Sequence, residues 1–326
     1  MLKVRGLNHG GIMVNYQCNA ACRHCLYACS PDRNNDYISK KTAEEICKLL
    51  VLGGCRSVHI GGGEPFLDFD GLITLTKTIR SAGITIDYVE TNGFWAADKK
   101  QAQSYLEALS DAGADNLCIA LDPFHAEYIP FGLPLSLAEI CRANNFDYFL
   151  WQERFLRCLA HISPTKAHSR EALEDQISPG YILETARRYG LSMGGRAINI
   201  ENEFTDAVPV AELLKTSTKT CRHLLSTDHF HVDLYGKFIP PGCTGIALPF
   251  EEVIKGFPHE KYPVYEALLT EGIAGLINFA AKNGFKLEEE YTSNCALCFY
   301  IRKWLCENSS YPELVPEHYD ASLTYY

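Results

Sequence analysis

Residues 18–29 read CNAACRHCLYAC, which places four cysteines within twelve residues. Cys18, Cys22 and Cys25 follow the spacing Cys-x3-Cys-x2-Cys. Three thiolates can hold three irons of a [4Fe–4S] cluster and leave the fourth iron open to a ligand. They can also begin a zinc site with Cys29 as the fourth ligand, because structural zinc takes a closed set of four ligands. The motif by itself leaves both metals open and favours iron–sulfur.

The composition limits the classes of protein and its compartment. The chain has 326 residues, a net charge of −10 and no run rich in Lys or Arg, so nucleic acid is not expected as a partner. It opens without a signal peptide, and no window reaches about 18 uninterrupted apolar residues, so no membrane span is expected. We therefore expect a cytoplasmic protein. Clustered cysteines among its 14 then indicate metal binding rather than disulfides.

The first two-thirds of the chain alternates predicted strands and helices. The strands are predicted at 11–17, 57–65, 84–93, 116–125, 146–152 and 191–200, and the helices at 42–54, 69–83, 99–113, 136–145 and 180–190. This alternation is typical of βα units and a parallel sheet. Polar residues follow several of these strands, at the sheet edge where α/β folds carry their sites.

After about residue 205 the pattern changes. A hairpin is predicted at 229–243, a helical stretch at 263–282 and a short helix at 298–305, and this part carries cysteines of its own. We expect two domains, 1–205 and a smaller one at 206–326.

A second motif joins the cysteine triplet. Gly62, Gly63, Glu64 and Pro65 follow the second predicted strand, about forty residues after the cysteines. The two motifs together resemble the radical S-adenosylmethionine (radical SAM) superfamily, over roughly residues 10–205. The resemblance implies a partial (β/α)6 barrel within the α/β class.

The resemblance also implies roles for residues. Cys18, Cys22 and Cys25 match the three cluster ligands, and the Gly-Gly-Glu-Pro turn matches the segment that binds the methionine amino group of SAM. His24 stands where the family usually has an aromatic residue against the adenine. Three residues match by position only, at strand ends that often contact the SAM ribose or the substrate: Thr91, Asn92 and Asp122.

The implied chemistry is that of an enzyme. In the family, an electron from the reduced cluster cleaves SAM to methionine and a 5′-deoxyadenosyl radical, which takes hydrogen from a substrate. The electron comes from a donor such as flavodoxin or ferredoxin. The cofactor carries the difficult chemistry, and the protein supplies orientation and excludes water.

The C-terminal cysteines resemble the SPASM/twitch extensions of radical SAM enzymes. Cys221, Cys243, Cys295 and Cys298 match the ligands of one auxiliary [4Fe–4S] cluster for electron transfer. Only Cys306 follows Cys298, so the full seven-cysteine SPASM pattern is absent and a twitch-like domain is the better match. We interpret Cys306 as a packing residue and leave the role of Cys29 open.

Two residues are the first candidates for catalysis at the strand ends. His125 follows Asp122 on the fourth predicted strand, and Arg196 follows two glycines on the sixth. The Arg fork matches a carboxylate bidentately, so Arg196 is suited to position SAM or substrate. The alternative for each is a satisfied polar group at a strand terminus.

The substrate is left between two classes. Peptide or protein side-chain modification is the first hypothesis, although only seventeen residues precede Cys18, so we expect no leader-binding domain there. The alternative is oxidation or rearrangement of a small metabolite such as a sugar, nucleoside or amino-acid derivative. A hypothesis of another class is a non-catalytic iron–sulfur or zinc-binding scaffold.

Overall fold

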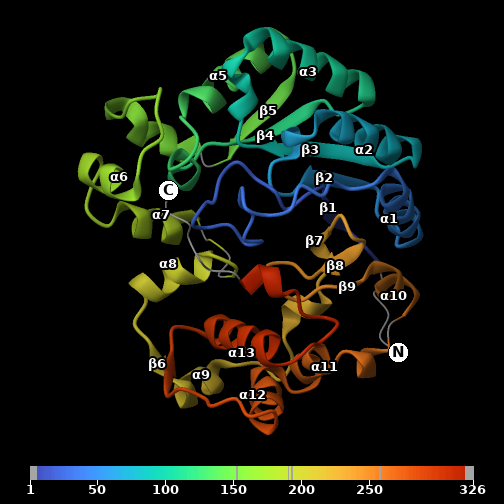
Figure 1. Ribbon diagram of the computed structural model, residues 1–326, viewed down its shortest axis with the longest axis vertical. Coiled ribbons are helices and arrows are strands. Elements are labelled where there is room, and N and C mark those ends of the chain that lie inside the picture. Colours follow the sequence, from blue (N-terminus) through green and yellow to red (C-terminus); the bar gives the residue numbers. More distant parts are fainter. Residues whose placement is uncertain (1–5, 152, 190, 192–193, 257, 320–326) are drawn as a thin grey trace.

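A single eight-stranded sheet organises the protein, as seen in a computed structural model (Figure 1). The structure describes residues 6–151, 153–189, 191, 194–256 and 258–319. The strand order is β5-β4-β3-β2-β1-β7-β8-β9. All neighbours from β5 to β7 are parallel, and β8 and β9 continue antiparallel. The parallel sheet that the alternation predicts is confirmed.

The strands are short, and successive side chains along each strand point to opposite faces of the sheet. Their bounds are β1 His9–Met13, β2 Ser57–Gly61, β3 Thr85–Thr91, β4 Asn116–Ala120, β5 Asp147–Trp151, β7 Asp228–Val232, β8 Lys237–Ile239 and β9 Leu248–Pro249. On β2, Val58 and Ile60 are fully buried and lie on one face, while His59 lies on the other. Two further strands, β6 Val208–Pro209 and β10 Glu290–Tyr291, form a separate antiparallel pair.

The first helices cover one face of the sheet (Figure 1). Their bounds are α1 Lys40–Leu52, α2 Phe69–Ser81, α3 Lys99–Ala112, α4 Pro123–Ala126 and α5 Gly132–Ala143. Local capping sets their ends. The Asp98 side chain accepts hydrogen bonds from the first turn of α3, and Gly113, at φ 95°, ends that helix in the left-handed conformation.

One predicted strand is wrong. The prediction at 191–200 falls partly outside the described residues, at 192–193, and the rest holds a turn followed by helix α8, Ala197–Phe204. Ile198 and Ile200 suit a strand by their period of two, but Ala197 and Ile198 are buried by tertiary packing on the helix. The sixth parallel strand is instead β7, which pairs with β1.

The rest of the chain is mostly helical, and in Figure 1 its first two helices lie to the left of the sheet while most of its later helices lie below it. The remaining helices are α6 Arg170–Gln176, α7 Tyr181–Tyr189, α9 Val210–Thr216, α10 Phe250–Lys255, α11 Pro263–Thr270, α12 Gly272–Lys282 and α13 Asn294–Asn308. The predicted hairpin is confirmed as β7–β8, turning at Gly236 with φ 74°. Strand β7 follows residue 205 in the chain but belongs to the same sheet as β1–β5. The domain boundary near residue 205 therefore stays a prediction. None of the described helices is long and apolar enough to cross a membrane.

Candidate functional site

The cysteine triplet lies in the loop after β1, and most of it is shielded from solvent. Cys18 and Cys22 are buried and Cys25 is half-buried, all as free thiols. The loop closes on itself: the Cys25 amide donates to the Cys22 carbonyl at 3.0 Å, and the Cys18 amide donates to the Ser30 carbonyl at 3.1 Å. We call residues 18–30 the cysteine loop. The three thiols are near enough to interact electrostatically, since, in addition to burial, Cys22 and Cys25 both raise the pKa of Cys18.

Arg196 fastens this loop from the N-terminus of α8. Its guanidinium donates to the carbonyls of Cys22 at 3.0 Å and Cys29 at 2.5 Å, and its own amide donates to the Cys25 carbonyl at 3.1 Å. The side chain is 2% exposed. Gly195, at φ 53°, allows this approach, because a Cβ there would lie 2.1 Å from the Leu26 carbonyl oxygen. The contacts therefore give Arg196 a positioning role.

A buried ion pair holds the loop from a second side. Arg23 Nε lies 2.8 Å from Glu127, just after α4, and both side chains are under 10% exposed. Burial raises the pKa of Glu127 to about 7, although Arg23 opposes that shift. A buried pair of this kind is costly to break, because removing one partner takes away the main charge that balances the other.

The Gly-Gly-Glu-Pro turn packs directly against the segment that leads into the cysteine loop. The Glu64 amide donates to the Gln17 carbonyl at 3.0 Å, and the Gly63 amide donates to Asn15. A Cβ on Gly63 would lie 2.0 Å from the Gln17 carbonyl oxygen. Gly62, at φ 147°, is in a conformation that other residues rarely adopt. The two sequence motifs are therefore adjacent in space.

Glu64 is the centre of a buried hydrogen-bond network. Its carboxylate accepts from the Asn92 amide at 2.8 Å, from the Thr91 hydroxyl at 2.9 Å and from the Phe66 amide at 3.2 Å. Asn92 also reaches the cysteine loop, where its side chain donates to Asn19 and contacts the Cys18 sulfur at 4.0 Å. Burial raises the pKa of Glu64 to about 7. A carboxylate has about four lone-pair positions, so one position on the oxygen facing Asn92 is left for a ligand.

Asp122 and His125 form a second polar unit beside the cysteines. Asp122 caps α4 and lies 2.6 Å from Nδ1 of His125. Burial works against ionisation of both, but their mutual attraction outweighs it, so the pKa of Asp122 falls to about 2 and that of His125 rises. His24 stacks on Phe124 at 4.7 Å and meets His125 edge-on at 5.1 Å. Burial lowers the pKa of His24 to about 4, and its Nδ1 has no partner among the described residues.

The three thiols differ in their acidity. Burial raises the pKa of Cys18 and of Cys22. For Cys25 the contact from Cys29 dominates, with a further contribution from Arg196, and its pKa falls well below the ordinary value. Cys29 thus acts on Cys25 as a hydrogen-bonding neighbour, which was not predicted.

The four C-terminal cysteines come from three segments that meet at α13. Cys295 and Cys298 lie in the first turns of α13, while Cys221 and Cys243 lie just before a short 3₁₀ turn and just after β8. Burial raises the pKa of Cys243 to about 12, and the electrostatic influence of Cys298, Cys221 and Cys295 adds to it. The predicted set is therefore close enough for its members to interact.

A buried cation accompanies this second set. Arg302, one turn after Cys298, is 4% exposed and donates to the Cys298 carbonyl at 3.3 Å and the Thr244 carbonyl at 2.7 Å. It also contacts Tyr319 at 3.0 Å. The cation is suited to balance the negative charge that four thiolates would bring. Cys306 is half-buried beside Phe299 and Tyr319, as a packing residue would be.

The structure brings the N-terminal site together as one unit. Two groups gather there, the cysteine loop with Glu64, Thr91 and Asn92, and the Asp122–His125 pair with His24. The residues that sequence reasoning missed are Asn15, Arg23, Glu127 and Arg302. Only Arg23, inside the cysteine loop, gave a positional signal; the partners of the others depend on tertiary contacts.

Comparison with known proteins gives the class. Residues 12–160 match the family model of the radical SAM superfamily. The matched segment includes the cysteine loop, the Gly-Gly-Glu-Pro turn and the Asp122–His125 pair. Residues 12–160 are therefore a radical SAM domain, a kind of domain that uses SAM and a [4Fe–4S] cluster.

Curated relatives match only part of the chain. A "Putative peptide biosynthesis protein YydG" of Bacillus subtilis is 28% identical, over 36% of this chain and 37% of the relative. A GTP 3′,8-cyclase of Alkaliphilus metalliredigens is 30% identical, over 36% of each chain. The match thus spans about a third of the length of these relatives.

Solved structures with some likeness cover more of the chain. The structure titled "Native anSMEcpe with bound AdoMet" has a TM-score of 0.45 at 13% identity, covering 96% of this chain and 93% of that one. Streptococcus suis SuiB bound to precursor peptide SuiA has a TM-score of 0.37 at 13% identity, covering 90% and 76%. At TM-scores below 0.5, neither bears on the activity of this chain.

The residues present fit the cofactors of the superfamily. Three clustered thiols suit three irons, and the depressed pKa of Cys25 favours the thiolate that a metal needs. The buried Glu64 carboxylate beside them suits an ammonium group.

Proposed function

We propose that this chain is a radical SAM enzyme that reductively cleaves SAM and abstracts hydrogen from a peptide or protein side chain. The observation that carries the proposal is the joint contact of Asn92 with Glu64 and with the cysteine loop. That contact ties the residues matching the cluster ligands to those matching the SAM ligands. The cluster and SAM, when bound, supply the hydrogen-abstracting radical.

The chain's own residues would orient the SAM methionine group. Cys18, Cys22 and Cys25 would hold three irons. The vacant lone pair of Glu64 would accept the methionine ammonium, while Thr91 and Asn92 keep the carboxylate in place. Gly62 and Gly63 let the backbone approach this group closely. His24 and Phe124 offer a stacked surface that suits the adenine.

His125 is proposed as the proton-handling group of the site. It is 22% exposed in its side chain, and Asp122 holds it protonated and oriented. A protonated imidazole can donate to a carboxylate or carbonyl of a ligand, and the buried Asp122 fixes which nitrogen is free. Arg196 is proposed to act through the loop it fastens.

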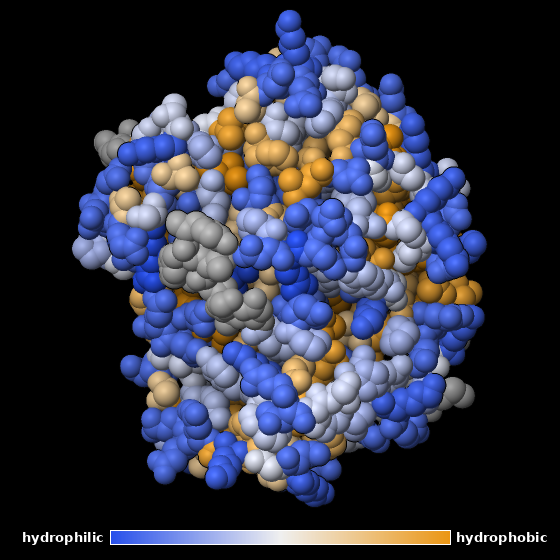
Figure 2. Space-filling model, in the orientation of Figure 1, coloured by the Kyte–Doolittle hydropathy of each residue, from blue (hydrophilic) through white to orange (hydrophobic). Residues whose placement is uncertain are grey.

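A peptide substrate has two supports. The B. subtilis relative carries a peptide-biosynthesis name. In addition, β5 is an edge strand with Phe149 39% and Trp151 46% exposed. Hydrophobic side chains gather in the upper part of the face in Figure 2, where Figure 1 draws β4 and β5. An edge strand with exposed aromatic side chains suits an extended peptide, which can add hydrogen bonds along it.

A small metabolite is the second candidate, favoured by similarity over the same region to GTP 3′,8-cyclases. Among the described residues at the cysteine loop, however, Arg196 and Arg23 are already engaged by carbonyls and by Glu127. A triphosphate would need cations free to bind it. This favours the peptide.

The C-terminal cysteines are proposed to hold one auxiliary [4Fe–4S] cluster in a twitch-like domain, 206–326, for electron transfer. Four thiolates close the coordination of all four irons, which suits electron transfer more than substrate binding. Arg302 would stabilise the charged form of the site.

Anaerobic reconstitution tests these proposals together. With iron and sulfide, about eight irons per chain are expected for two four-iron clusters, and 5′-deoxyadenosine should form with SAM and dithionite. Replacing Cys18, Cys22 and Cys25 by Ala should abolish 5′-deoxyadenosine and leave about four irons. Replacing the four C-terminal cysteines should also leave about four irons but retain SAM cleavage. Zinc in place of iron with no cleavage would support the scaffold instead.

A further inference from the structure

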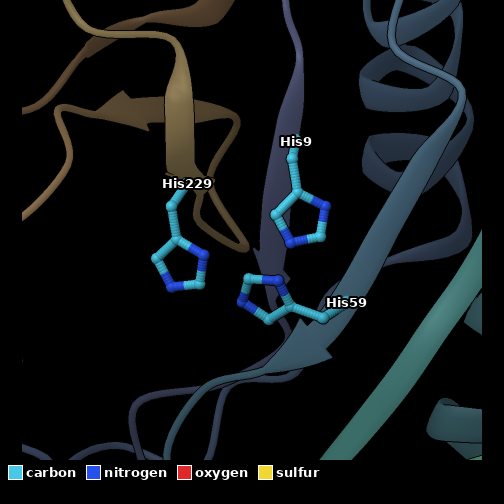
Figure 3. Close-up of side chains that lie close together, drawn as sticks. All are labelled: His9, His59 and His229. Atoms are coloured by element: carbon cyan, nitrogen blue, oxygen red, sulfur yellow. The ribbon is translucent and has the colours of Figure 1, made fainter.

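Four histidines gather on the face of the sheet opposite the helices. His9 begins β1, His59 lies on β2, and His229 and His231 lie on β7. These strands are neighbours in the order β2-β1-β7, so residues from opposite parts of the chain meet. Figure 3 shows the rings of His9, His59 and His229 turned toward one another.

The three rings have the spacing of ligands around one ion. A nitrogen from each of His9, His59 and His229 lies within 4.8 Å of the other two. The ring centroids are 4.9–5.7 Å apart. Three imidazoles on a tetrahedral zinc, with Zn–N of about 2.0–2.1 Å, place their centroids roughly 5 Å apart. Small side-chain rotations therefore suffice to close the set.

His59 presents an unused nitrogen inside this group. The side chain is fully buried, and its Nδ1 has no hydrogen-bond partner among the described residues. Its Nε2 lies 3.1 Å from Nε2 of His231, and His231 Nδ1 lies 3.0 Å from the Tyr27 hydroxyl. If Nδ1 of His59 binds a metal, Nε2 carries the proton and donates it to His231. A buried polar atom left without a partner destabilises the fold, and a metal ion bound to it would offset that cost.

His9 has the support that ligating histidines usually have. Its Nδ1 lies 3.1 Å from Oδ2 of Asp87 on β3, which is within ion-pair distance but lacks hydrogen-bond geometry, so a small rotation would be needed to form that bond and leave Nε2 for an ion. A carboxylate behind a ligating imidazole fixes its tautomer and strengthens its basicity. Asp87 is thus placed as the outer partner of the site.

His229 is directed by unusual backbone. It has φ 61°, and β1 and β7 shift register between His9 and Gly10, which leaves residue 229 as the extra residue of a bulge. Bulges re-aim a side chain, and a left-handed non-glycine residue carries a cost that surrounding structure must repay. Here the side chain that the bulge turns is the third histidine.

We infer that His9, His59 and His229 form a site for a divalent transition-metal ion of the zinc type, with a fourth position open to water or another ligand. Three neutral imidazoles and an open position are the donor set of such sites. The exposed His229 leaves that position accessible from solvent.

The test uses the full chain with its cysteines occupied by iron–sulfur clusters, so that thiols do not compete. Zn²⁺ is titrated anaerobically against a chromophoric chelator, and zinc and iron are counted separately. Zinc K-edge absorption then reads the ligand shell. The site predicts one zinc per chain and a shell of nitrogen and oxygen at about 2.0–2.1 Å, without sulfur at about 2.3 Å.

Variants make the assignment specific. His9→Gln and His229→Asn, the latter tolerant of the left-handed backbone, should each weaken zinc binding more than about 100-fold, beyond the 10–100-fold of an outer-partner loss. Asp87→Asn should weaken it about 10–100-fold. Asn8→Ala, which removes the contact to Asp228 at the same strand edge, should leave it unchanged. Absence of zinc, a sulfur shell, or wild-type affinity in both histidine variants would overturn the site. Iron content reports on the clusters independently.

Discussion

Replacing Arg196 separates a positioning role from direct contact with SAM. Arg196→Met keeps a long side chain but removes the donors to the carbonyls of Cys22 and Cys29. Both carbonyls belong to buried residues. An unsatisfied buried acceptor costs about 1–3 kcal/mol, so two cost about 2–6 kcal/mol. This loss should concentrate in the cysteine loop, because both carbonyls belong to it.

Amide hydrogen exchange of the cluster-free chain measures that loss locally. The lower bound of about 2 kcal/mol corresponds to roughly 30-fold faster exchange in peptides covering residues 18–30. Iron bound by the N-terminal set should fall in parallel. Arg196→Lys supplies one donor and should recover part of both. Arg188→Met removes only an exposed ion pair and should change neither.

The opposite pattern would refute the reasoning. If Arg196→Met exchanged and bound iron as the wild type does but lost SAM cleavage, the side chain would contact SAM or substrate itself. If exchange, iron and cleavage were all unchanged, the two hydrogen bonds would be of no consequence.

Three further predictions concern the same site. Gly195→Ala should lower the iron content of the N-terminal set, because its Cβ would lie 2.1 Å from a carbonyl oxygen of the cysteine loop. The control Gly180→Ala also has a positive φ but nothing within 4 Å, so it should bind iron normally. Equal iron contents in the two variants would contradict the prediction. Glu127→Ala should lower the free energy of unfolding of the cluster-free chain, measured by urea denaturation, by about 3–5 kcal/mol. The double variant Arg23→Met with Glu127→Leu should recover most of that stability. If it does not, the buried charge of Arg23 is not the cause of the loss. The pKa of Glu64 is raised to about 7 in the folded chain, from an ordinary value of about 4.5. Between these two values the folded chain keeps a proton that the unfolded chain releases. The contribution of Glu64 to stability is therefore present at low pH and is lost as the pH rises through 7. SAM binding should instead tighten over that range, since the ammonium needs the carboxylate, and Glu64→Gln should flatten the profile in a calorimetric titration.

The features that the sequence predicted well are those set by local chemistry. The Cys-x3-Cys-x2-Cys spacing and the Gly-Gly-Glu-Pro turn each depend on a few consecutive residues, and both lie where the alternation of strands and helices predicts. Gly62 needs its unusual φ and Gly63 its lack of a Cβ. Each requirement is met by one residue type at one position, so the sequence alone predicts these features.

The features that were missed depend on tertiary pairing. The residues around Arg196 in the sequence do not indicate that it donates hydrogen bonds to carbonyls of the cysteine loop. The spacing Ile198-x-Ile200 is compatible with both a strand and a helix. The histidine site is the extreme case. His59 alone reads as a core histidine, and it meets His229 only because β7, from the far part of the chain, pairs with β1. Strand order over so long a separation cannot be read from periodicity.

Helix α8 links the two cysteine sets. Its first turn carries Arg196, which holds the cysteine loop, while Ile198 packs with Ala296 and Phe299 of α13. Glu201 accepts a hydrogen bond from Ser293, the residue that caps α13 just before Cys295. The predicted domain boundary near residue 205 thus falls at the end of an element that both parts share. Because one short helix contacts the supports of both sets, a shift of the cysteine loop would be passed by direct packing to the helix that carries Cys295 and Cys298.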